Sequence, residues 1–172
     1  RVIQLPGGGS VVAMEGDYQE DAHVWRLVNK SNPLNNVDYR PEIAKPSVNT
    51  RQDKSLDEQS VRRDITAAVE ELFQAAETDG HQLQIASGFR SSSLQNTYYS
   101  NYARVYGQEA ADKFSAKPGY SEHQTGLAID ISTPDHHCYL QACFGETAAG
   151  LWLRDHVHHY GFILRYPKEK EG

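Results

Sequence analysis

The sequence has no excess of basic residues, no long apolar run and only two cysteines. Its 17 Lys and Arg residues stand against 23 Asp and Glu residues, a formal net charge of −6. This balance argues against a nucleic-acid partner, because neutralising phosphates requires a basic surface. No apolar segment approaches the length of a membrane span, which predicts that this chain has no transmembrane segment. No secretory signal begins at Arg1, but a trimmed chain would look the same, so localisation stays open.

The length and the hydrophobic content suit a single domain. With 172 residues, of which 38% are hydrophobic, the chain can bury a core without a framework of cross-links. Residues 1–22 are polar and rich in glycine, which predicts a linker or an N-terminal arm. The domain itself is therefore expected over residues 23–172, and we expect it to be a monomer.

The two cysteines, Cys138 and Cys143, lie five positions apart. They could be unrelated thiols in a reducing compartment, or a local disulfide in an oxidising one. A metal site is less favoured, because the sequence has no second cysteine pair. We favour the disulfide.

The apolar pattern predicts a mixture of helices and short strands. One helix is expected over 56–79 and ends at Gly80, because apolar residues recur there at three- and four-residue spacing. Residues 38–53 are rich in Pro and Asn, which predicts an irregular surface segment. Further helices are expected over 92–106, 109–115 and 146–160, and strands over 24–28, 83–85, 127–131 and 162–166. The irregular order predicts an α+β fold with a small, mostly antiparallel sheet and flanking helices.

A histidine and an aspartate are the strongest candidates for chemistry. His123 precedes the predicted strand 127–131, and Asp130 lies within it. A carboxylate in an apolar strand is costly unless it is paired or binds a metal. Gly126 allows the backbone to bend so that the two side chains approach. The pair could be a hydrogen bond that holds a turn, or two ligands of a catalytic zinc.

A second candidate is Arg90, which lies at a predicted strand-to-helix turn between Ser87 and Ser91, with Gln95 one helical turn further on. An arginine in this position could bind a carboxylate or a developing oxyanion. It could equally be a solvated arginine or a residue that caps the helix.

Together, these segments resemble the VanY-type D-alanyl-D-alanine carboxypeptidases, zinc peptidases of the bacterial cell wall. The resemblance extends from about Trp25 to the end of the sequence. The matching segments occur in order: Leu27-Val28-Asn29-Lys30, Ser87-Gly88-Phe89-Arg90-Ser91 with Gln95, Lys117-Pro118-Gly119-Tyr120-Ser121-Glu122-His123-Gln124-Thr125-Gly126-Leu127-Ala128-Ile129-Asp130, and Tyr160-Gly161-Phe162-Ile163-Leu164-Arg165-Tyr166-Pro167-Lys168.

The resemblance implies a fold shared with D-alanyl-D-alanine peptidases and the hedgehog signalling domain. It implies Zn2+ as the cofactor, with His123 and Asp130 as two of three ligands. Arg90 would stabilise the oxyanion, and Gln95 and Ser121 would contact the substrate. The implied partner is the peptidoglycan stem peptide, from which one C-terminal D-alanine is removed at a D,D bond.

That substrate implies an extracytoplasmic protein, in the cell envelope or secreted by a bacterium, where a Cys138–Cys143 disulfide would form. Two alternatives remain at this point: an L,D-carboxypeptidase that acts on tetrapeptide stems, and a non-catalytic cell-wall-binding module of the same fold.

The sequence departs from the family pattern near its end. The family's general base and third zinc ligand lie in a Glu-x-Trp-His segment after the Arg-Tyr-Pro-Lys stretch, and this sequence contains no Glu-x-Trp-His. We therefore expect both groups beyond Gly172, and expect a chain that stopped there to release no D-alanine. The competing possibility is that groups within the sequence complete the site: His23, His136 or His137 as a ligand, and Glu20 or Glu122 as base.

Overall fold

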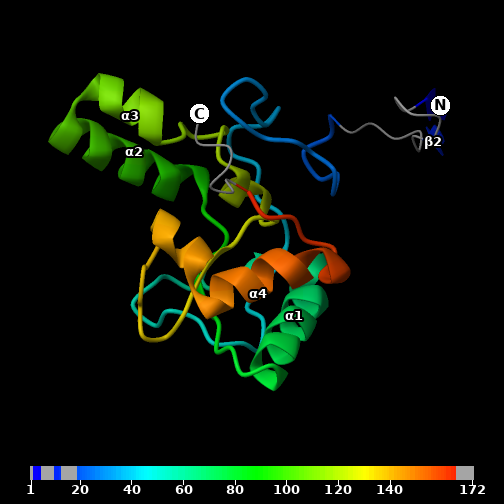
Figure 1. Ribbon diagram of the computed structural model, residues 1–172. Coiled ribbons are helices and arrows are strands. Elements are labelled where there is room, and N and C mark those ends of the chain that lie inside the picture. Colours follow the sequence, from blue (N-terminus) through cyan, green and yellow to red (C-terminus); the bar gives the residue numbers. More distant parts are fainter. Residues whose placement is uncertain (1, 5–9, 13–18, 166–172) are drawn as a thin grey trace.

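Two helices, α1 and α4, lie side by side and enclose the core of the protein (Figure 1). The computed structural model describes residues 2–4, 10–12 and 19–165. α1 (Thr66–Thr78) follows the short 3-10 helix η1 (Arg63–Ile65), and α4 (Ala148–His156) continues into η4 (Val157–Tyr160). The buried apolar cluster comprises Val61, Val69, Leu72, Phe73, Ala76, Leu83, Ile85, Ala149, Trp152, Leu153 and Val157.

The described strands form three small antiparallel sheets of two strands each. β1 (Val2–Gln4) pairs with β2 (Ser10–Val12), and β3 (Ile43–Ala44) pairs with β4 (Val61–Arg62). β5 (Gln84–Ser87) pairs with β6 (Asp130–Ser132). Small antiparallel sheets with flanking helices confirm the predicted α+β class.

The β5–β6 pair contains an irregularity that shapes the site. Ile85 lies opposite Ile131, but the next partners are Ser87 and Asp130, so the register shifts between Ile85 and Ser87. A bulge of this kind re-aims side chains locally. Here it brings Ser87 opposite Asp130, at the end of the sheet where the chain turns toward α2.

Two further helices form a hairpin that extends away from the core (Figure 1). α2 (Ser92–Tyr106) has the bounds predicted from the sequence, and α3 (Gln108–Phe114) begins one residue earlier than predicted. The Ser91 hydroxyl caps α2 by accepting a hydrogen bond from the Leu94 N–H. Gln95 is the buried residue of α2, so this helix is joined to the domain mainly at its first turn.

The helix predicted over 56–79 is shorter than expected. Residues 56–60 form turns, Val61 and Arg62 form β4, and the α-helix starts at Thr66. The backbone carbonyls of Glu58 and Ser60 accept hydrogen bonds from the N–H groups of Gly88 and Phe89, at 2.6 and 2.7 Å. This long-range pairing replaces the helical hydrogen bonds that the apolar spacing predicted. The last predicted helix is also divided, into η3 (Ala142–Glu146), α4 and η4.

Three predicted strands are wrong or displaced. Residues 24–28 are not a strand, and Arg26 is buried there while donating to the Gln19 side chain. The strand predicted over 127–131 begins only at Asp130 and runs to Ser132. Residues 162–165 contain no strand, and residue 166 lies outside the described residues.

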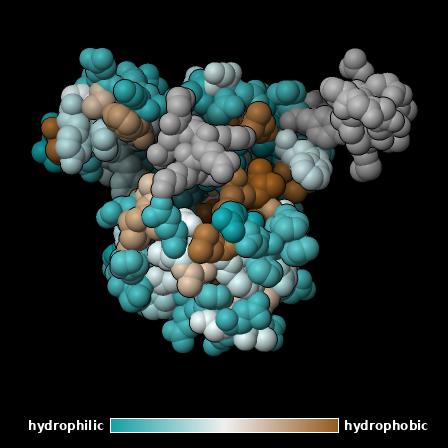
Figure 2. Space-filling model, viewed as in Figure 1, coloured by the Kyte–Doolittle hydropathy of each residue, from teal (hydrophilic) through white to brown (hydrophobic). Residues whose placement is uncertain are grey.

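The surface carries exposed apolar groups between the α2–α3 hairpin and the core (Figure 2). Ile163 and Leu164, which follow η4, are among the exposed apolar residues. None of the helices in the described ranges is both long and apolar enough to span a bilayer.

Candidate metal and substrate site

His123 and Asp130 meet at the start of β6, as the sequence pattern suggested. His123 lies in the 3-10 helix η2 (Glu122–Thr125), and its Nε2 is 3.3 Å from Oδ2 of Asp130. Gly126 ends η2 in the left-handed conformation, with φ of 72°. A side chain there would be strained by that φ and would also press on the Arg62 backbone, which explains the glycine.

The second ring nitrogen of His123 fixes how the imidazole faces Asp130. Nδ1 lies 2.8 Å from the carbonyl oxygen of Gly88. A carbonyl only accepts, so Nδ1 carries a proton and Nε2 faces the carboxylate. At 3.3 Å, Nε2 and Oδ2 lie close enough to share a proton or to bind a common cation. Metal-binding histidines typically donate their other N–H to a carbonyl in this way, so the pair fits two ligands of zinc.

The surroundings of Asp130 favour its ionised form. Burial raises the pKa of this carboxyl group, but the hydrogen bond from His123 and the positive charges of His123, Arg90 and Lys54 outweigh that effect. The pKa of Asp130 therefore lies below its usual value, and the group is a carboxylate near neutral pH.

Arg90 is held in place beside this pair. Its terminal nitrogens donate to Oγ of Ser87 and to Oε1 of Gln95, both at 3.1 Å, and its guanidinium lies 5.1 Å from the centre of the Tyr98 ring. Its main-chain N–H donates to the carbonyl of His123, which joins the two candidate segments. The Nε of Arg90 is buried and has no hydrogen-bond partner among the described residues. Each terminal nitrogen carries a second N–H, so the accessible part of the guanidinium can still donate to an oxygen of a bound substrate.

The two residues expected to contact substrate lie nearby. Gln95 is only 2% exposed, and its amide accepts from Arg90 and donates to the carbonyl of Ala116 at 2.6 Å. Both ends of this amide are thus engaged within the protein. Ser121 is buried at the start of η2, where its carbonyl accepts from the N–H of Gln124.

A polar cluster that the sequence pattern did not predict lies next to Arg90. Glu58 is buried and accepts hydrogen bonds from the Tyr98 hydroxyl, from Nζ of Lys54 and from Ser55. Tyr98 lies three residues after Gln95 in α2, so helical spacing alone could have placed it on the same face. Lys54 and Glu58 were hidden because the helix was predicted to begin at residue 56.

The other histidines do not join the His123–Asp130 pair. Nε2 of His136 contacts Oε1 of Gln84, His156 stacks on Trp152, and Nδ1 of His23 accepts from the N–H of Trp25. Within residues 2–4, 10–12 and 19–165, no three His, Cys, Asp or Glu side chains form a group that could hold a metal ion. A disulfide joins Cys138, in the loop before η3, to Cys143 within η3.

The end of the described chain passes close to η2. The Arg165 guanidinium lies 3.1 Å from a carboxylate oxygen of Glu122, the residue immediately before His123. This ion pair places the segment that follows η4 next to the turn that carries the histidine.

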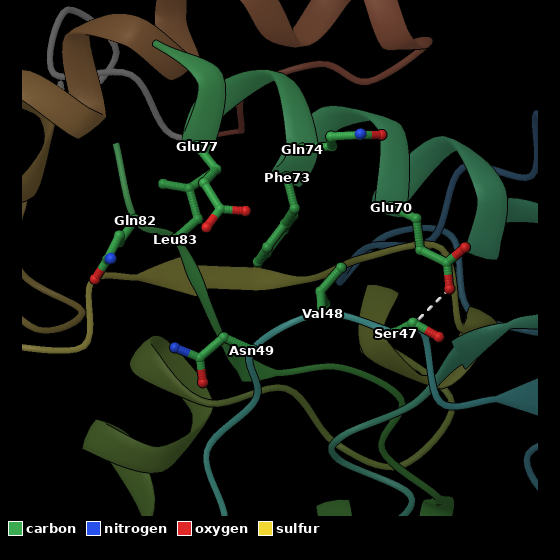
Figure 3. Close-up of a pocket in the computed structure, with 9 residues that line it drawn as sticks. All are labelled: Ser47, Val48, Asn49, Glu70, Phe73, Gln74, Glu77, Gln82 and Leu83. Atoms are coloured by element: carbon green, nitrogen blue, oxygen red, sulfur yellow. Dashed lines mark hydrogen bonds between the residues drawn. The ribbon is translucent and has the colours of Figure 1, made fainter. Parts of the chain in front are cut away.

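A surface pocket of about 640 Å³ lies elsewhere, against α1 (Figure 3). It is bounded by Glu70, Phe73, Gln74 and Glu77 of α1 and by residues 47–49 and 82–83. Glu70 spans part of it by accepting from the N–H of Ser47 at 2.6 Å. The lining includes neither His123 nor Asp130, so this pocket is separate from the candidate site.

Comparisons with known proteins match the same segments. The family model of VanY, D-alanyl-D-alanine carboxypeptidase, matches residues 58–172. The putative carboxypeptidase YodJ of Bacillus subtilis is 37% identical over 154 residues, which cover 89% of this chain and 56% of YodJ. A D-alanyl-D-alanine carboxypeptidase of Enterococcus faecalis is 31% identical over 165 residues, or 91% of this chain and 55% of the relative. The chain thus spans little more than half the length of these curated relatives.

Solved structures show the same fold. The LdcB LD-carboxypeptidase superposes with a TM-score of 0.81 at 37% identity, covering 88% of this chain and 71% of LdcB. The D,D-pentapeptidase VanY of a VanB-type resistance cassette, solved as an E175A mutant with Zn(II), gives a TM-score of 0.64 at 29% identity and covers 84% of this chain and 77% of its own. The family model covers more than half of the chain, and the motifs that it matches converge around His123, Asp130 and Arg90. The chain therefore belongs to the VanY D-alanyl-D-alanine carboxypeptidase family.

Proposed function

We propose that the protein is a zinc-dependent carboxypeptidase that removes a C-terminal D-alanine from peptidoglycan stem peptides. One observation carries the proposal: His123, oriented by the Gly88 carbonyl, presents Nε2 to the Asp130 carboxylate at 3.3 Å. An imidazole nitrogen and a carboxylate oxygen are both ligand types that catalytic zinc uses, and here they face each other at a distance that one cation could bridge.

Each described side chain then has a distinct task. His123 and Asp130 hold the metal, which when bound would polarise the scissile carbonyl and acidify a water molecule. Arg90 offers its guanidinium to the carbonyl oxygen as negative charge develops there. Ser87 and Gln95 position Arg90 through their hydrogen bonds. Ser121, which immediately precedes η2, would contact the substrate.

A third ligand and a general base are also required, because catalytic zinc sites normally use three protein ligands and amide hydrolysis needs a proton acceptor. Among the described residues, no third ligand joins the pair. We place both groups outside the described residues. The Glu122–Arg165 ion pair supports this, because it holds the segment after η4 close to His123.

The bond that is cleaved has two candidates. The sequence resemblance and the D-alanyl-D-alanine carboxypeptidase relatives favour the D,D bond of a pentapeptide stem. The similarity to the LdcB LD-carboxypeptidase, at 37% identity and a TM-score of 0.81, favours the L,D bond of a tetrapeptide stem. Either substrate would place the protein outside the cytoplasm, in agreement with the Cys138–Cys143 disulfide.

The test combines zinc content with product analysis. The full-length protein with zinc should release D-alanine from a pentapeptide ending in D-alanyl-D-alanine or from the tetrapeptide, detected by mass. His123→Ala and Asp130→Ala should each lose zinc on dialysis and lose activity, whereas the exposed His137→Ala should retain both. Equal zinc content in wild type and both site variants would refute the metal site.

Two further outcomes separate the alternatives. Retained zinc without product from either peptide would indicate a non-catalytic cell-wall-binding module. Zinc-dependent turnover by the 172-residue chain alone would show that the remaining groups come from within this sequence.

A further inference from the structure

Lys54 is a second cation held close to Arg90. Its Nζ donates to Oε1 of Glu58 and to the hydroxyl of Tyr98, each at 3.2 Å, and lies 5.5 Å from the centre of the Tyr98 ring. The Arg90 guanidinium packs on the same ring, at 5.1 Å. Tyr98 therefore joins the two positive groups into one cluster.

The Lys54 ammonium is held in place by two acceptors, but these do not occupy all of its N–H donors. The Glu58 side chain is 5% exposed and that of Lys54 is 25% exposed, so the anion is buried and the cation reaches solvent. An ammonium has three N–H donors, and two acceptors contact this one among the described residues. One donor is left for a ligand.

Lys54 is a charged ammonium at neutral pH. Burial lowers its pKa, but the hydrogen bonds that it donates to Tyr98 and Glu58 outweigh this effect, so the pKa lies above its usual value. The side chain is thus a permanent positive charge at the edge of the site.

A carboxypeptidase must recognise a free carboxylate next to the bond that it cleaves. When Arg90 serves the carbonyl oxygen, a separate cation is needed for that carboxylate. We propose that Lys54, held by Glu58 and Tyr98, binds the C-terminal carboxylate of the substrate. This inference rests on the proposed function and names the residue that would make the enzyme specific for a free chain end.

The competing explanation is that Lys54 only ties residues 54–60 to α2. The two roles separate when the stem peptide carries either a C-terminal carboxylate or a C-terminal carboxamide. A carboxylate-binding lysine affects only the first peptide, whereas a structural lysine affects both peptides equally.

The experiment compares the full-length wild type with Lys54→Met on both peptides. For the carboxylate peptide, Lys54→Met should lower kcat/KM by about 10- to 100-fold, mainly through KM, because a hydrogen bond to a charged group is lost. For the carboxamide peptide, kcat/KM should be unchanged. Lys54→Arg should restore part of the loss. The control is Lys45→Met, which removes the same charge from an exposed lysine bonded to Gln59 and should change neither value.

A measurement of peptide binding tests the same assignment without relying on turnover. Calorimetry with the zinc-loaded protein should show that wild type prefers the carboxylate peptide and that Lys54→Met loses the preference. Equal losses on both peptides, or a preference that survives the substitution, would overturn the assignment of Lys54. Failure of the wild type to cleave either peptide while it still prefers the carboxylate would instead refute the proposed function.

Discussion

The interface of α1 and α4 and the site around β5 and β6 bury very different side chains. The helical interface buries apolar groups such as Leu72 and Leu153, which pack without directional bonds. The site buries Gln95, Gln124 and Glu58, and each has hydrogen-bond partners at defined distances. Apolar packing depends on area and tolerates small shifts, whereas a buried polar group that loses its partner costs the full penalty of desolvation.

The difference teaches which substitutions should act on stability and which on activity. The core should lose stability when volume is removed, without a change in chemistry. The site should lose activity when one polar group is removed, even where the fold persists.

The largest effect on stability is expected for Leu72→Ala. Leu72 is fully buried in α1, and truncation of such a leucine costs about 2–5 kcal/mol in the free energy of unfolding. The control, Leu151→Ala, removes the same atoms from an exposed position of α4 and should cost far less. Urea unfolding measures the stability of both variants. Equal losses of stability in Leu72→Ala and Leu151→Ala would contradict the placement of Leu72 in the core.

Arg90→Ala should lower turnover about 100- to 1000-fold, the typical effect of removing one preorganised oxyanion donor. Its effect on unfolding should be small, because the variant loses two hydrogen bonds but also removes a buried Nε without a partner. Arg90→Lys should rescue poorly, since a point charge lacks the planar two-pronged geometry. Arg104→Ala, an exposed arginine in the last turn of α2, is the control and should be fully active. Near-normal activity of Arg90→Ala would refute its role.

The same contrast explains how far the sequence could predict the structure. The buried stripe of α1 and the exact extent of α2 follow from local spacing and caps, because those signals lie within the helices themselves. Segment 56–60 could not be predicted from local spacing. Its backbone is bonded to Gly88 and Phe89, and Gly88 has no room for a side chain beside the Ser60 carbonyl.

The candidate site divides in the same way. The approach of His123 to Asp130 was expected from the glycine between them. The orientation of His123 by Gly88, 35 residues earlier, could not be expected, because it depends on how β5 meets η2. The Lys54–Glu58–Tyr98 cluster was missed for the same reason, since it joins an irregular segment to a helix 40 residues later.

Glu58→Gln should cost about 1.5–3 kcal/mol in the free energy of unfolding near neutral pH, the range for hydrogen bonds to a charged group. Burial raises the pKa of Glu58, but hydrogen bonds from Tyr98, Ser55 and Lys54 outweigh it, so the pKa lies below its usual value. The stabilisation is therefore complete above the pKa of the unfolded chain, about 4.3, and is lost as the pH falls through the lower folded value.

The difference between wild type and Glu58→Gln should consequently shrink in acid, as measured by urea unfolding at several pH values. The matched control is Glu71→Gln, on the exposed face of α1. This substitution should leave the free energy of unfolding nearly unchanged at every pH. A difference that grew in acid would contradict the ionised state of Glu58.

The smallest effects are expected for substitutions of the N-cap residues of α4 and α2. These two substitutions compare the core and the site most directly. Thr147 caps α4 by accepting from the N–H of Gly150, and Ser91 caps α2 by accepting from the N–H of Leu94. Loss of an N-cap typically costs about 1 kcal/mol.

Because α4 packs in the core, Thr147→Ala should lower the free energy of unfolding by about 1 kcal/mol and leave turnover unchanged. In α2 the first turn carries Gln95, which positions Arg90, so Ser91→Ala should lower kcat with little change in KM or unfolding. If both variants instead lost stability equally and turnover not at all, the first turn of α2 would have no part in positioning Arg90.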